Sequence, residues 1–145
     1  MDGINARHCY LYLRDSSCTM TDEECSRWNT SWLTEAAKAF MSAAYLGQRG
    51  DKRALNFLKI AKNCGTAEEQ AYARHLEAAL TFTLLHDHEE AIRIGKEVVG
   101  LARNLGDREL EGDALEGISM VYESLGDAKA REMYEREAAK VREER

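Results

Sequence analysis

The chain has 145 residues, a formal net charge of −6 and a pI near 5.3, so we expect one acidic domain with its own core. Hydrophobic residues make up 44% and charged residues 32%, which excludes a disordered chain, and the lack of proline argues against a loop-rich all-β fold. The acidic balance argues against nucleic acid and anionic membranes as partners, and no apolar stretch is long enough to cross a bilayer. Residues 1–14 lack a basic segment followed by an apolar one, so we expect a cytoplasmic protein.

The first 28 residues are the hardest to interpret. Residues 8–13 fit either a short strand or the first turns of a helix, and residues 15–17 are typical of a turn. Thr21 and Glu24 form a capping box, which predicts a short helix carrying Trp28. We therefore treat residues 1–28 as a separate N-terminal cap segment.

Four cysteines are present, and no two of them form the C-x-x-C pair of common zinc sites. The simplest interpretation is free thiols in a reducing compartment, some of them buried as small apolar side chains. A zinc or redox site remains an alternative, and its residues would come from the N-terminal segment: His8, Cys9, Cys18 and Cys25.

From residue 29 onward, helical periodicity and breaking residues predict six helices. The first is capped by Thr30 or Ser31 and runs to residue 46. The next four span residues 52–63, 67–85, 88–104 and 108–125, and the last approaches the C-terminus. Gly65 is suited to a left-handed cap after the second of these helices, and Thr66 with Glu69 forms a capping box before the third.

The segment His86-Asp87-His88-Glu89-Glu90 resembles a metal cluster at first sight. It lies at a turn and a helix start, where Asp87 is a good N-cap and the two glutamates favour the helix dipole. We favour capping over metal binding, and we expect no metal and no cofactor.

Three turns repeat along the chain: Gly50-Asp51, His86-Asp87 and Gly126-Asp127. They lie 36 and then 40 residues apart, and each separates two helices of similar length. A single helical hairpin cannot bury its apolar face, so such units stack on one another.

The last unit resembles a tetratricopeptide repeat of the longer type, with a period near 40 residues. Ile118, Ser119 and Tyr122 fall on the family's leucine, small and aromatic positions, and residues 125–127 fall on its turn between helices. The middle unit matches at Phe82 but has His86 in place of the usual glycine, and all units lack the family's closing proline. The resemblance implies an all-α fold, a right-handed superhelix of about three antiparallel hairpins over residues 29–145.

The same resemblance implies function: the first helix of each hairpin would line a concave groove that holds another protein. The predicted groove residues are Phe40, Ala44, Ala73, Leu76, Leu80, Thr83, Asp113, Glu116, Met120 and Glu123. An apolar wall in the first two units and carboxylates in the third would suit a peptide or helix with an apolar anchor and a basic segment. The alternative for the carboxylates is a solvated acidic face.

Trp28, Trp32 and Phe40 form an aromatic group near the start of the repeats. It is expected to cap the end of the stack, and the alternative is a homodimer contact or an anchor for a partner. No catalytic motif is present, so we expect a scaffold or adaptor rather than an enzyme. A homo-oligomeric assembly unit, or a small regulatory domain sensing redox state or metal through its N-terminal cysteines, are the alternatives.

Overall fold

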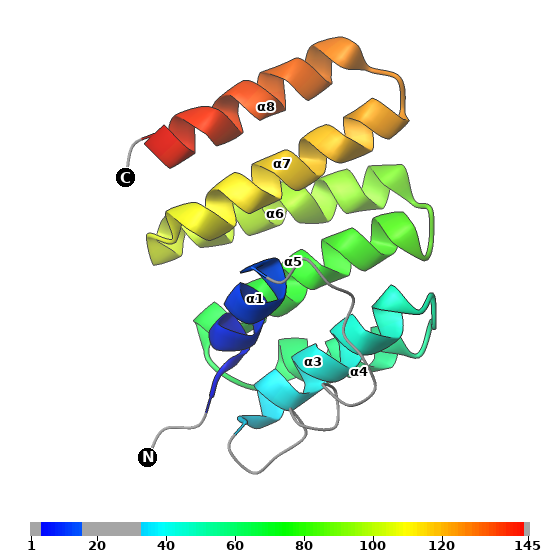
Figure 1. The fold of residues 1–145 in the computed structure, drawn as a ribbon, viewed down its shortest axis with the longest axis vertical. Helices are drawn as coiled ribbons and strands as arrows, with labels where there is room; N and C mark the ends of the chain where they lie inside the picture. The colour runs from blue at the N-terminus through cyan, green and yellow to red at the C-terminus, as the bar shows by residue number, and fades with distance from the viewer. Residues whose placement is uncertain (1–3, 16–32, 144–145) are drawn as a thin grey trace. The chain divides into compact units, whose positions relative to one another are not determined.

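The computed structural model describes residues 4–15 and 33–143, and every regular element in these ranges is an α-helix, apart from one isolated β-bridge (Figure 1). The all-α prediction is therefore confirmed for this part of the chain. The helices are α1 (Ala6–Asp15), α3 (Glu35–Gln48), α4 (Ala54–Asn63), α5 (Ala67–Thr83), α6 (His88–Leu105), α7 (Arg108–Ser124) and α8 (Ala128–Glu143). None of them is long and apolar enough to cross a membrane.

The structure divides into two compact units, Met1–Leu76 and Glu77–Arg145, with α5 beginning in the first and ending in the second. The predicted division between residues 1–28 and 29–145 stays a prediction. The N-terminal residues belong with the first unit because α1 packs against α3, and because Ile4 forms a parallel bridge with Leu33.

The three repeated turns have nearly the same backbone geometry. Gly50, His86 and Gly126 all have positive φ, at 71°, 53° and 77°. The aspartate after each accepts a hydrogen bond from a backbone N–H two or three residues later: Arg53 at 2.9 Å, Glu90 at 3.1 Å and Ala130 at 3.0 Å. Each turn therefore ends one helix with a left-handed residue, and Asp87 and Asp127 then cap the next helix. Asp51 instead bonds the backbone N–H of Arg53, the residue before α4, and does not cap that helix.

A fourth copy of this turn lies between α6 and α7. Gly106 has φ of 70°, and Asp107 accepts from the backbone N–H of Leu110 at 3.0 Å. The Asp residues at 87, 107 and 127 thus divide the second unit at intervals of 20 residues, one helix each.

In the first unit, α3, α4 and α5 meet at alanines. Ala39, Ala61 and Ala73 form a buried cluster with one residue from each helix, and side chains of this size let helix backbones approach closely. In the same unit, Tyr10 of α1 packs on Tyr72 of α5 with ring centroids 4.8 Å apart. Residues 8–13 lie within α1, so of the two predicted alternatives the helix is confirmed and the strand is wrong.

In the second unit, α7 packs against both α6 and α8. Gly95 of α6 lies so close to Ile118 of α7 that a Cβ atom on it would be 2.7 Å from Ile118 Cγ1. Tyr122 of α7 stacks on Tyr134 of α8, with centroids 5.6 Å apart and planes 14° apart. The absence of a side chain at Gly95 thus lets α6 approach α7 closely, and the Tyr122–Tyr134 pair fills the interface between α7 and α8.

The predicted cap of α3 is wrong. The helix begins at Glu35, and its N-cap is Thr34, whose hydroxyl accepts from the backbone N–H of Ala37 at 3.0 Å. Thr30 and Ser31 fit the local capping pattern equally well, but Thr34 also bonds the carboxylate of Glu69, which lies 35 residues away in sequence. This tertiary contact is invisible to a local pattern.

Candidate interaction surface

Four of the six residues predicted for the apolar wall of the groove belong to the core. Phe40, Ala44, Ala73 and Leu80 are all buried, with at most 6% of each residue exposed, so a partner cannot reach them in this structure. Leu76 is half-buried, and only Thr83 among the predicted residues of α5 is exposed. The prediction placed these residues by family position, and the structure uses them in the cores of the two units instead: Phe40, Ala44 and Ala73 in the first and Leu80 in the second.

Arg142 of α8 binds two of the three predicted carboxylates on α7, and Arg131 only lies near the third. Arg142 of α8 donates to Asp113 at 2.9 Å and to Glu116 at 2.7 Å. The Glu116 hydrogen bond raises the pKa of Arg142, and Asp113 acts in the same direction. Glu123 faces Arg131 at 4.0 Å, the longest of these pairs.

Met120 is the most exposed apolar side chain among the predicted groove residues. It is 55% exposed near the C-terminal end of α7, one turn from Glu116 on one side and Glu123 on the other. Methionine is enriched at protein interfaces, where its unbranched, polarizable side chain adapts to different partners. Leu125, at the end of the same helix, is 53% exposed.

Glu69 organises the first unit, and only part of its role was predicted. The capping box is confirmed, since Glu69 N–H donates to Thr66 Oγ1 at 3.1 Å and Thr66 N–H donates to Glu69 Oε1 at 3.3 Å. Its other oxygen, Oε2, also accepts from Ala6 N–H at 2.9 Å and from Thr34 Oγ1 at 2.7 Å. One buried carboxylate therefore connects the starts of α1, α3 and α5.

The thiols that the structure describes are poorly suited to redox or metal chemistry. Cys9 is fully buried, and burial, with a smaller contribution from the Glu69 charge, raises the pKa of its thiol to about 12. Burial and the charges of Glu69 and Glu35 also raise the pKa of Cys64, whose Sγ donates to Ile60 O at 3.0 Å. Thiolate is the reactive and metal-binding form, so both environments work against it.

The capping interpretation of residues 86–90 is confirmed, because Asp87 Oδ1 accepts from Glu90 N–H at 3.1 Å. In residues 4–15 and 33–143, no three His, Cys, Asp or Glu side chains are close enough to hold a metal ion. His88 instead packs edge-on against Phe82 at 5.3 Å, and its Nε2 lies 3.1 Å from Ser124 Oγ. The contact between His88 and Ser124 connects the start of α6 to the end of α7, and we assign it a structural role.

Several predictions lie outside the described residues. They are the capping box at Thr21 and Glu24, the oligomer contact at Trp28 and Trp32, and the zinc ligands Cys18 and Cys25.

No protein-family profile, curated protein or solved structure that was compared with this chain matches it. The tetratricopeptide resemblance therefore depends on the residues quoted in the sequence analysis alone.

Proposed function

We propose that this protein is a scaffold or adaptor, built from tetratricopeptide-like hairpins stacked as a right-handed superhelix, that holds another protein. The repeated turns support the architecture, because a left-handed residue followed by an aspartate that accepts from a nearby backbone N–H recurs at positions 50–51, 86–87 and 126–127. The close helix contacts through alanine and glycine support it too.

The observation that carries the proposed function is the exposure of Met120 between Glu116 and Glu123. The partner is a peptide or helix that places an apolar side chain on Met120 and a basic side chain on Glu123. Glu123 is the available carboxylate, because its side chain is 64% exposed and its own arginine is 4.0 Å away. Asp113 and Glu116 are less available, since Arg142 already bonds both.

This proposal is narrower than the groove predicted from the sequence. The partner contacts the α7 surface of the second unit, and the buried residues of α3 and α5 support the fold.

Site-specific photo-crosslinking tests the proposal. A photoreactive residue at position 120 should give a distinct cross-linked protein in a lysate of the source organism, and Glu123→Lys should reduce its yield. The matched control carries the photoreactive residue at Lys59, which is exposed on α4 in the other unit. Identical products from positions 120 and 59 would contradict the proposal.

A further inference from the structure

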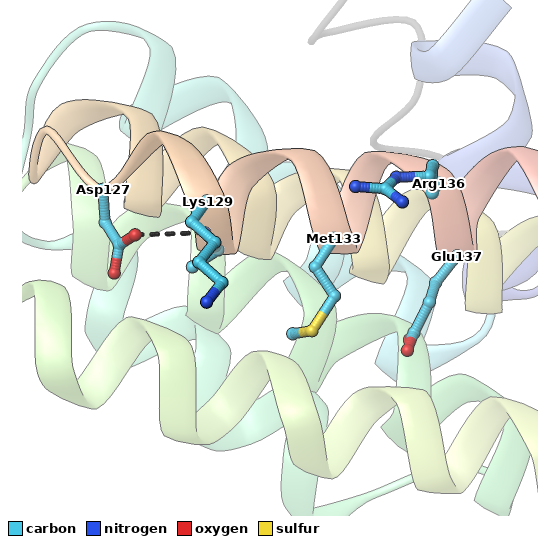
Figure 2. A pocket seen from close by; sticks show the side chains of 6 residues that line it. Asp127, Lys129, Met133, Arg136 and Glu137 are labelled. Atoms are coloured by element: carbon cyan, nitrogen blue, oxygen red, sulfur yellow. Dashed lines mark hydrogen bonds between the residues drawn. The ribbon is translucent and has the colours of Figure 1, made fainter.

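One face of α8 carries a hollow of about 540 Å³. It is lined by Asp127, Lys129, Ala130, Met133, Arg136 and Glu137 (Figure 2). Met133 is 47% exposed at its centre, and Figure 2 shows Lys129, Met133 and Glu137 extending from the same side of the helix. An apolar centre with charges around it has the layout of a small protein interface.

The charges of this face differ from the other charges of α8. Arg131 pairs with Glu135, and Arg142 pairs with Asp113 and Glu116. Among the residues that the structure describes, none forms an ion pair with Lys129, Arg136 or Glu137. Lys129 and Glu137 are about 12 Å apart along the helix axis, two turns, so they cannot pair with each other.

The sequence of the face is complementary to itself when reversed. Lys129 lies four residues before Met133, and Glu137 lies four residues after it. In an antiparallel pair of helices with a two-fold axis at Met133, each Lys129 therefore faces the Glu137 of the other copy, about 6 Å along the axis from the centre. In the same way, Ala130 of each copy faces Arg136 of the other copy, and the small alanine side chain leaves room for the long arginine side chain.

We propose that this face is a homodimer interface, in which α8 packs antiparallel against α8 of a second copy. Two Met133 side chains meet at the centre, and two Lys129–Glu137 pairs close the ends. The lining has two acidic and two basic residues, so two copies of the face do not repel each other despite the net charge of −6. This surface is different from the aromatic group at Trp28 and Trp32, and the proposal does not depend on the scaffold function.

A single helix face buries less than the roughly 800 Å² per partner of a standard interface, so the dimer is expected to be weak. Sedimentation equilibrium of the full chain, in reductant and from about 10 µM to 1 mM, covers the range of weak association. Wild-type protein should change from monomer to dimer across this range. A monomer at every concentration would overturn the proposal.

Charge reversal tests the pairing itself. Lys129→Glu and Glu137→Lys should each raise the dissociation constant about tenfold, because both symmetric pairs change from attraction to repulsion. The double variant should restore wild-type association, since it exchanges the two charges. Lys59→Glu makes the same charge change on α4 and should have no effect. A dimer that tolerates Lys129→Glu, or a double variant that stays monomeric, would overturn the antiparallel α8 arrangement.

Discussion

Replacing Glu69 with alanine should cost the first unit a large part of its stability. The carboxylate is 3% exposed and accepts from three donors: Ala6 N–H, Thr34 Oγ1 and Thr66 N–H. A hydrogen bond to a charged group contributes about 1.5–3 kcal/mol, and a buried donor that loses its acceptor pays its desolvation in full.

The free-energy cost of losing the acceptor differs among the three donors. Ala6 is fully buried, so water cannot replace the lost acceptor there. Thr66 is exposed, so its N–H can bind water. Thr34 can rotate its hydroxyl and still cap α3. We therefore expect Glu69→Ala to lower the free energy of unfolding by about 3 kcal/mol, mostly through the Ala6 amide.

Urea denaturation followed by circular dichroism measures this change, and a loss of this size should lower the midpoint by about 1–3 M. Glu68→Ala is the matched control, because it removes a carboxylate from the same helical turn and should cost under about 1 kcal/mol. Glu69→Gln should be intermediate, since it keeps one carbonyl oxygen but turns an NH₂ group toward a donor. If Glu69→Ala cost no more than Glu68→Ala, the idea of Glu69 as the connection between three helix starts would be wrong.

Four further perturbations test other parts of the structure. Gly95→Ala should destabilise the second unit by about 1 kcal/mol in urea, because overpacking against Ile118 outweighs the gain in helix propensity; the paired variant with Ile118→Val should recover part of the loss. His86→Gly should stabilise the same unit by about 0.5–1 kcal/mol, since His86 has a positive φ of 53° that glycine adopts without strain. A lower melting temperature for the variant than for the wild-type protein would contradict a strained turn. Arg142→Gln should lower the free energy of unfolding by about 1 kcal/mol at low salt and by less at high salt, because salt screens the ion pairs with Asp113 and Glu116. The same loss at both salt concentrations would contradict a contribution from these ion pairs. Cys9 should resist iodoacetamide in the folded protein, and mass spectrometry showing rapid alkylation at pH 8 would contradict a pKa of about 12.

The same thiol gives stability a predictable dependence on pH. The pKa of Cys9 is higher in the folded chain, about 12, than its ordinary value of 9.0. Its contribution is therefore fully present below pH 9 and is lost as pH rises toward 12, because the unfolded chain releases the proton first. Wild-type stability should fall more steeply than that of Cys9→Ala in this range.

Sequence periodicity predicted the six helices after residue 29 well, because their ends are determined by local chemistry. Gly106 ends α6 and Asp107 begins α7, and both features can be read from neighbouring residues. The same local reasoning placed the cap of α3 too early, since the choice of Thr34 depends on Glu69 in another helix. Local patterns thus determine helices, and contacts distant in sequence decide between equivalent starts.

The site was harder to predict than the fold. The family pattern identifies which face of a helix turns inward, but it does not say whether that face meets a partner or the protein's own core. Phe40 and Leu80 illustrate the difference, because both occupy groove positions and both are buried. Arg142 shows the same limit for charge, since its pairing with Asp113 joins residues 29 apart in sequence.

The proposed scaffold requires that the hairpins stack into a continuous superhelix. Backbone residual dipolar couplings of the isotopically labelled protein test it most directly, because they report the orientation of every helix in one frame. The account predicts that couplings from α3, α4, α6, α7 and α8 fit one alignment tensor, with successive hairpins related by a constant right-handed rotation. Two different tensors, one for each compact unit, would contradict a superhelix and the groove that depends on it.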